Sequence, residues 1–134
     1  MTIVGLGIDA TEIDRIEATI ARHGDRFLSR IFTEGEIAYC QRHRNPGPSF
    51  AARFAAKEAV MKALGTGHAQ GVLWRDVEVV RHGGPPQLRL HGGALRRFEA
   101  LGAQCSLLTL THARDLAIAQ VLLLGPPRST PVSG

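Results

Sequence analysis

An alanine-rich segment near the middle of the chain constrains the fold more than any other feature of the sequence. Residues 49–64 read SFAARFAAKEAVMKAL, and alanine and straight-chain residues are the strongest helix formers. Ser49 is a suitable N-cap, and Gly65 stands where a left-handed residue commonly ends a helix. Small side chains cover little of such a helix, so we expect another element to pack closely against its alanines at 51, 52, 55, 56, 59 and 63.

Apolar periodicity predicts a strand and two helical regions before this segment. Thr2 to Ile8 is a short β-branched run that predicts a buried strand ended by Asp9. Thr11 would then cap a helix with an isoleucine stripe at 13, 16 and 20. Thr33-Glu34-Gly35-Glu36 matches a capping box, so another helix should begin there and run to about His43.

The second half of the chain alternates strands with one short helix. Residues 72–81 and 87–91 are predicted strands joined by a Gly-Gly-Pro-Pro turn, and residues 93–101 form a helix. Residues 106–111 and 116–124 are apolar strand candidates around a turn at 112–115. We expect a single domain over residues 1–125 and a disordered tail over 126–134, which reads PPRSTPVSG.

Composition narrows the class of partner. Sixteen Lys and Arg against twelve Asp and Glu give a formal charge of +4, which favours an anionic partner: nucleic acid, coenzyme phosphates, anionic lipid or an acidic protein. Seven aromatic residues are few for a protein that stacks bases, which argues against nucleic acid. No apolar run approaches the ~20 residues of a membrane span, and the N-terminus lacks a signal peptide pattern. Because no apolar run is long enough to span a membrane, we expect no membrane partner. Cys40 and Cys105 lack metal-site spacing, so we expect a reduced, cytoplasmic location.

Several charged residues could carry chemistry. On the long helix Arg53 and Lys57 share one face, as do Glu58 and Lys62, which an ordinary surface helix would also show. Cations around a single acid also suit a place where a metal ion meets phosphates. Asp9 could cap a turn, or it could join Glu58 as the carboxylate pair that holds Mg²⁺.

Three further signals are weak when taken alone. Gly65-Thr66-Gly67 could cradle a phosphate with backbone amides, although a lone GTG is a common sequence. His112 ends a strand, where most histidines are surface residues. The basic residues Arg15, Arg22 and Arg26 would align if residues 11–30 formed one continuous helix, but Gly24 could break it.

The order of these segments closely resembles that of the bacterial holo-acyl-carrier-protein synthases, the small class of 4'-phosphopantetheinyl transferases. The blocks are GIDATEIDRI, RIFTEGEI, AARFAAKEAVMKALGTG, LWRDVEV, GGPPQLRL and TLTH, and they run from about Gly5 to Val121. The last block has Thr109 and Thr111 where the family commonly has serine, which keeps a hydroxyl. The resemblance implies an α+β subunit with a small, mainly antiparallel sheet packed on a long central helix, assembling as a homotrimer with coenzyme A at the subunit interfaces.

The resemblance also implies an activity and a role for each candidate residue. Such enzymes transfer the phosphopantetheine arm of coenzyme A to a serine of apo acyl carrier protein and release adenosine 3',5'-bisphosphate. Asp9 and Glu58 would hold Mg²⁺ against the pyrophosphate, and Lys62 would stabilise the charge that develops during transfer. The coenzyme would contact Arg53, Lys57 and His112, with Gly65, Thr66 and Gly67 lining the nucleotide pocket, while Arg15 would face the acidic carrier protein. The helical alignment of Arg22 and Arg26 with Arg15, which does not depend on the resemblance, would extend that docking surface.

Two other functions remain open at this point. A coenzyme A binding protein on the same scaffold would need Arg53 but not both carboxylates, and both are present. A basic nucleic-acid-binding module would bind with a steep salt dependence, and the small number of aromatic residues argues against it.

Overall fold

The structure is a computed structural model that describes residues 1–67 and 69–127. It contains eleven secondary-structure elements over those residues. The strands are β1 (Thr2–Glu12), β2 (Val77–Val80), β3 (Gln87–Leu90), β4 (Cys105–Ala113) and β5 (Leu116–Gly125). The helices are α1 (Ile13–His23), α2 (Asp25–Ile31), α3 (Glu34–Gln41), α4 (Gly47–Leu64) and α5 (Gly92–Ala100), with a 3-10 turn η1 (Trp74–Asp76). Residues 128–134 of the predicted tail lie outside the described residues.

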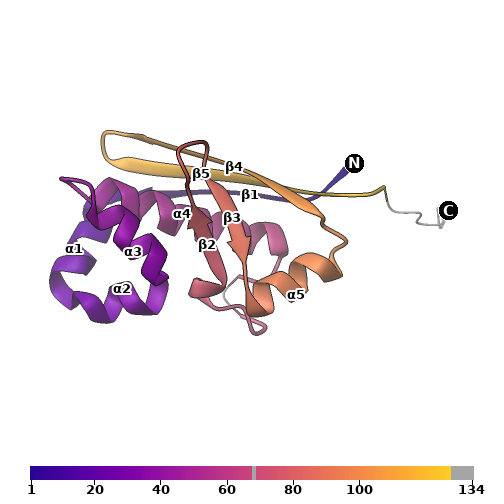
Figure 1. Ribbon diagram of the computed structural model, residues 1–134, viewed down its shortest axis with the longest axis horizontal. Coiled ribbons are helices and arrows are strands. Elements are labelled where there is room, and N and C mark those ends of the chain that lie inside the picture. Colours follow the sequence, from indigo (N-terminus) through magenta and orange to yellow (C-terminus); the bar gives the residue numbers. More distant parts are fainter. Residues whose placement is uncertain (68, 128–134) are drawn as a thin grey trace.

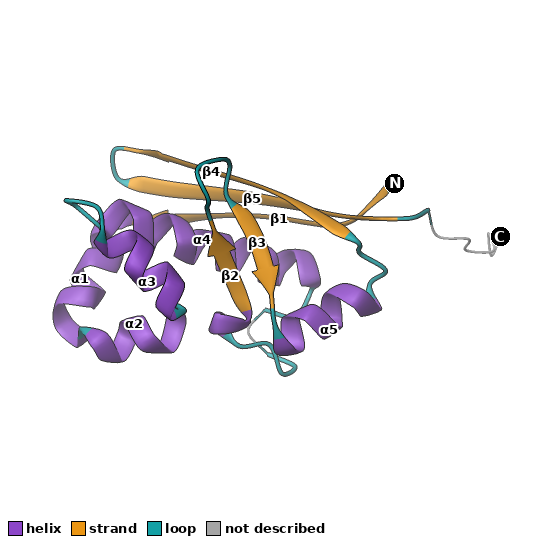
Figure 2. Cartoon of the chain, viewed as in Figure 1, coloured by secondary structure: helices purple, strands orange, loops and turns teal. Residues whose placement is uncertain are grey.

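The strands form two antiparallel sheets. The larger sheet has the order β1-β5-β4, and the smaller is the β2–β3 hairpin that the sequence predicts. Figure 1 shows the helices gathered on one side of the larger sheet, and Figure 2 shows the hairpin crossing in front of α4. The expected α+β class with antiparallel strands is therefore confirmed.

Helix α4 packs directly on the inner face of the larger sheet. Thirteen of its eighteen residues are buried, and β5 turns Ala117, Ala119, Val121 and Leu123 to the same core. The closest approach is to β1, because a Cβ on Gly7 would lie 1.8 Å from the Ala59 carbonyl oxygen. A Cβ on Gly5 would lie 2.6 Å from the carbonyl oxygen of Ala63. Glycine in the strand and alanine in the helix together allow this contact, which answers the expectation of a close neighbour.

A buried ion pair connects α4 to α3 and β2. The Lys57 ammonium donates to Glu36 Oε1 at 2.8 Å, and both side chains are inaccessible to solvent. Glu36 Oε1 also accepts from the Thr33 amide at 2.9 Å, which completes the predicted capping box, and Oε2 accepts from the Val79 amide at 2.9 Å. One carboxylate therefore fixes the start of α3, the middle of α4 and strand β2 together.

Two predicted helix caps are wrong. Strand β1 continues through Asp9 to Glu12, so Asp9 does not end the strand and Thr11 does not cap α1. The first amide of α1, that of Ile13, donates instead to the Asp115 carbonyl at 2.7 Å in the turn after β4. Helix α4 begins at Gly47 after Pro46, and the Ser49 hydroxyl bonds to Cys40 Sγ and to Arg53.

Other boundaries differ less from expectation. Gly65 ends α4 in the left-handed conformation, as predicted, with φ 77°. The predicted strand over residues 72–81 is shorter, because residues 74–76 form the turn η1 and only Val77–Val80 pair with β3. Gly24 separates α1 from α2, so Arg15, Arg22 and Arg26 do not lie along one continuous helix. Within residues 1–67 and 69–127, no helix is long and apolar enough to span a membrane.

The outer face of the larger sheet is apolar and exposed. The side chains of Ile3, Leu6, Ile8 and Leu107 are each 57–58% exposed. Leu6 and Leu107 both face Leu122 of the central strand, and Ile3 lies opposite Leu124. An exposed apolar surface of this extent marks an interaction site more often than an ordinary surface.

The close contact between α4 and β1 predicts the effect of a single methyl group. Gly7→Ala should lower the free energy of unfolding by about 1–3 kcal/mol or more, because the added Cβ overlaps the Ala59 backbone. Chemical denaturation measures the loss. Gly84→Ala is the matched control, since its Cβ would meet nothing within 4 Å, and equal stability of the two variants would contradict the packing described.

Candidate active site

An acidic pocket opens where β1, α1, α2 and α4 meet. It has a volume of about 530 Å³, and its ionisable lining residues are Asp9, Glu12, Arg15 and Glu58. Its apolar lining includes Phe27, and Phe54 stacked on Trp74 with ring centroids 5.1 Å apart. The structure thus brings Asp9 and Glu58, which are 49 positions apart in the sequence, to one pocket.

Lys62 is joined to this pocket through Asp9. Its ammonium donates to Asp9 Oδ1 at 2.7 Å and to the Ile8 carbonyl at 3.1 Å. The hydrogen bond and the negative charge of Asp9 raise the pKa of Lys62, and the charge of Glu58 adds to this. Lys62 therefore remains a cation while more than half of its side chain is open to solvent.

The carboxylate oxygens of the acidic pocket suit a hard divalent cation that a substrate also coordinates. Within the part of the chain that the structure describes, there is no group of three or more His, Cys, Asp or Glu side chains arranged to hold a metal ion. Mg²⁺ in phosphate chemistry needs only one or two protein carboxylates, with water and phosphate oxygens completing the octahedron. Asp9 and Glu58 fit that requirement.

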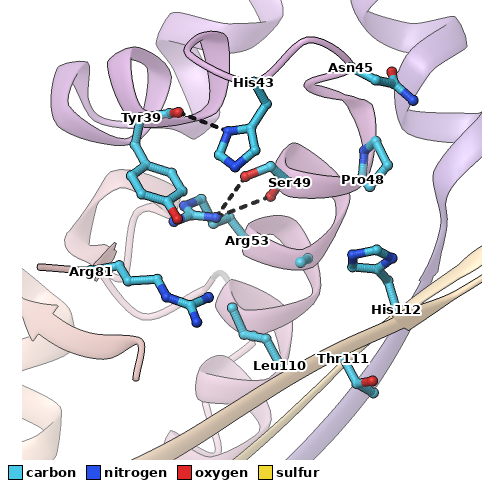
Figure 3. Close-up of a pocket in the computed structure, with 11 residues that line it drawn as sticks. Tyr39, His43, Asn45, Pro48, Ser49, Arg53, Arg81, Leu110, Thr111 and His112 are labelled. Atoms are coloured by element: carbon cyan, nitrogen blue, oxygen red, sulfur yellow. Dashed lines mark hydrogen bonds between the residues drawn. The ribbon is translucent and has the colours of Figure 1, made fainter. Parts of the chain in front are cut away.

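A basic pocket of about 560 Å³ lies between α3, α4 and the end of β4 (Figure 3). Its titratable lining residues are Tyr39, His43, Arg53, Arg81 and His112, and no acidic residue is among the described residues that line it. Figure 3 shows that the side chains of Arg81 and Arg53 approach the pocket from one side and His112 from strand β4. The pocket is suited to an anion.

Arg53 is the best-defined member of this pocket. Only 4% of the residue is exposed, and its guanidinium lies 4.2 Å from the centre of the Tyr39 ring. Its Nη1 donates to Ser49 Oγ at 2.9 Å, whereas its buried Nε has no hydrogen-bond partner among the described residues. A buried unsatisfied donor costs about 1–3 kcal/mol. The positive charge of Arg53 in the pocket wall favours a bound anion.

Three titratable residues of the basic pocket do not appear among the predicted site residues. Tyr39 and His43 lie four apart near the end of α3, and His43 Nδ1 is 3.2 Å from the Tyr39 carbonyl oxygen. Arg81 follows β2, and its Nε donates to the Gly84 carbonyl at 2.9 Å. The i,i+4 spacing of Tyr39 and His43 is a usable signal, but the proximity of Arg81 comes only from the path of the hairpin.

The structure does not place Lys57 in either pocket. All three of its donors are used inside the protein, by Glu36 Oε1 and by the carbonyls of Trp74 and Val77. Burial lowers the pKa of Lys57, and the charge and hydrogen bond of Glu36 oppose that shift. The prediction that Lys57 contacts a coenzyme phosphate is therefore wrong in this geometry, because its ammonium is enclosed and saturated.

The Gly65-Thr66-Gly67 segment does not form a cradle of free amides. The amides of all three residues point back to the Met61 carbonyl, at 3.0, 3.2 and 3.4 Å. The Thr66 hydroxyl donates to the Gly67 carbonyl at 2.8 Å. These bonds close the end of α4, so the segment can border a ligand by its shape but offers no free amide nest to a phosphate.

The three candidate docking arginines occupy different places. Arg15 lines the acidic pocket, and Arg26 lines a neighbouring cavity of about 470 Å³ together with His23, Phe27 and Arg30. Phe27 belongs to both, so the two hollows adjoin. Arg22 is exposed on the last turn of α1.

The acidic and basic pockets lie at opposite edges of the larger sheet. The acidic pocket takes Asp9 to Glu12 from β1, and the basic pocket takes Leu110, Thr111 and His112 from β4. Strand β5 separates these two edge strands, and the described linings share no residue. Within one chain, Arg53, Arg81 and His112 therefore do not share a pocket with Asp9 and Glu58.

Comparison with known proteins finds similar sequences and folds over most of the chain. Residues 5–121 match the family model described as the 4'-phosphopantetheinyl transferase superfamily. The holo-[acyl-carrier-protein] synthase of Solibacter usitatus is 52% identical over 122 residues, which cover 90% of this chain and 98% of that protein. The holo-[acyl-carrier-protein] synthase structure from Neisseria meningitidis superposes with a TM-score of 0.82 at 30% identity, covering 92% and 99% of the two chains.

A further structural neighbour carries a ligand. The holo-[acyl-carrier-protein] synthase of Helicobacter pylori, solved in complex with coenzyme A, superposes with a TM-score of 0.78 at 28% identity, covering 89% of this chain and 99% of that one. Together with the family match over residues 5–121, these similarities show that the chain belongs to the 4'-phosphopantetheinyl transferase superfamily.

Proposed function

We propose that the protein is a holo-acyl-carrier-protein synthase, which transfers the 4'-phosphopantetheine arm of coenzyme A to a serine of apo acyl carrier protein. The observation that carries the proposal is the acidic pocket, where Asp9 and Glu58 lie together and Lys62 is bound to Asp9. The carrier serine oxygen forms a bond to the phosphorus next to the pantetheine arm. The bond from that phosphorus to the bridging oxygen breaks, and adenosine 3',5'-bisphosphate leaves.

The acidic pocket supplies charge and position for this step. Asp9 and Glu58 would hold Mg²⁺, which when bound neutralises the pyrophosphate of the coenzyme. Lys62, kept cationic beside Asp9, stabilises the negative charge that builds on the phosphate and the leaving group. We assign the serine proton to Glu58, which takes it directly or through a water molecule that it holds.

The basic pocket holds the remaining phosphate charge of coenzyme A. Arg53 and Arg81 supply positive charge from one side of the pocket, and His112 adds a hydrogen-bonding group from strand β4. The pyrophosphate and the 3'-phosphate give the coenzyme several anionic groups to match these donors. Gly65, Thr66 and Gly67 are not among the described lining residues of either pocket, and they would border the nucleotide through the shape of the segment, since their amides are used within α4.

We further propose that one transferase domain, residues 1–125, assembles as a homotrimer that completes each site between two copies. The exposed apolar face of the larger sheet gives the copies a common surface to bury. The acidic and basic pockets flank opposite edge strands, β1 and β4, so a head-to-tail ring brings the acidic pocket of one copy towards the basic pocket of the next.

Acyl carrier protein is the acidic macromolecular partner. The surface of this chain on which the carrier docks is formed by Arg15, Arg22 and Arg26. The cavity lined by Arg26 adjoins the acidic pocket through Phe27. A carrier bound there presents its serine to Asp9 and Glu58. Opposite charge on the two surfaces accelerates encounter and makes it sensitive to salt. The reaction belongs in the cytoplasm, where coenzyme A and carrier protein are both available.

Mass spectrometry of a carrier protein tests the transfer. Incubation with coenzyme A and Mg²⁺ should add ~340 Da to an apo carrier, the mass of the phosphopantetheine arm gained in a metal-assisted phosphoryl transfer. Asp9→Ala and Glu58→Ala should each slow this on the order of a hundredfold or more, whereas the exposed Glu99→Ala should not. If coenzyme A binds but no carrier gains mass, the protein is a coenzyme A binding protein and the proposal fails.

The assembly is tested by one charged substitution on the outer sheet face. Leu6→Lys places an ammonium in the apolar surface, so light scattering after size-exclusion chromatography should show monomers in place of trimers. Leu73→Lys is the control, because Leu73 is 66% exposed and lies outside that sheet. A Leu6→Lys protein that remains trimeric would move the interface elsewhere.

A further inference from the structure

One arginine of helix α5 contacts the end of α4. Arg97, half-buried on α5, donates from Nε to the Leu64 carbonyl at 2.9 Å. Its Nη2 lies 3.7 Å from the position that a Cβ on Gly65 would occupy. The guanidinium therefore lies across the junction between α4 and the Gly65-Thr66-Gly67 segment.

This contact satisfies a specific group at the helix end. The last carbonyls of a helix have no partner within it and carry a partial negative charge. The amides of residues 65–67 fold back to Met61, and the Gly65 amide also reaches the Lys62 carbonyl at 3.1 Å. The Leu64 carbonyl is taken by Arg97 instead, which adds a full positive charge at the same end.

Helix α5 also holds the far end of the same loop. A Cβ on Gly93, in the first turn of α5, would lie 2.0 Å from the Gly71 carbonyl oxygen, so the two backbones are in contact. The Leu73 amide donates to Asp76 Oδ2 at 3.0 Å, and Val72 is buried. The segment between α4 and η1 is thus fixed at its start by Arg97 and at its end by Gly93 and Asp76.

We infer that Arg97 is a positioning residue for coenzyme A: it fixes the last turn of α4, which carries Lys62, and the Gly65-Thr66-Gly67 segment that borders the nucleotide. The inference rests on the proposed function, because that function places the coenzyme against this segment. The amides of residues 65–67 are used inside the helix cap, so the segment contributes to coenzyme binding through its shape. Arg97 maintains that shape.

Two substitutions at position 97 and one neighbouring control test the inference. Arg97→Gln removes the cation, Arg97→Lys keeps one that can reach the Leu64 carbonyl, and the control Arg96→Gln changes an exposed arginine on the same helix. In Arg97→Gln, amide hydrogen exchange of residues 65–67 and 69–73 should rise about tenfold. The dissociation constant for coenzyme A, measured by calorimetry, should rise about five- to twentyfold. Arg97→Lys should recover most of both, and Arg96→Gln should match the wild type.

The outcomes separate this inference from the proposed function. An unchanged affinity for coenzyme A in Arg97→Gln overturns the inference, even if exchange in the segment rises, because Arg97 would then serve stability alone. A loss equal in Arg97→Lys and Arg97→Gln also overturns it. A wild-type protein that binds coenzyme A without transferring the arm refutes the proposed function but leaves the affinity test of Arg97 valid, whereas failure to bind coenzyme A refutes both.

Discussion

The close contact between the backbone of α4 and strand β1 is the constraint on which the rest of the structure depends. Gly7 lies against the Ala59 carbonyl and Gly5 against that of Ala63, with no side chain between them. Asp9 follows Gly7 by two residues on the same face of the strand, and Glu58 and Lys62 precede Ala59 and Ala63 by one. The contact that packs the helix on the sheet therefore also sets Asp9 beside Lys62 and in one pocket with Glu58.

Local sequence patterns predict the helices and strands well, and they fail where a tertiary contact replaces a local one. The Thr33 capping box and the left-handed Gly65 need only neighbouring residues, and both are present. The cap expected at Thr11 is replaced by a backbone bond from Ile13 to Asp115, about a hundred residues away in the chain. No local pattern can signal such a partner.

In the candidate site, too, prediction fails where a tertiary contact decides the place of a side chain. Asp9, Glu58 and Lys62 lie in or beside the acidic pocket, and Arg53 and His112 line the basic pocket. Lys57 lies in neither, because its partner Glu36 is 21 residues earlier on another helix and encloses the charge in the core. A buried lysine with a carboxylate partner cannot be told from a surface ligand by helical spacing alone. The Lys57–Glu36 pair is neutral as a unit, so the net charge of +4 comes from the other ionisable residues.

Complementation between two inactive variants tests the central claim, that each site is completed by two copies, most directly. Asp9→Ala lacks the acidic half and Arg53→Ala lacks the basic half, so neither should transfer alone. Randomly mixed trimers from equal amounts should regain about a quarter of the wild-type sites, since an intact half must come from each side of a head-to-tail interface. Activity no greater than the sum of the separate variants, in samples that native mass spectrometry shows to contain mixed trimers, would contradict the account.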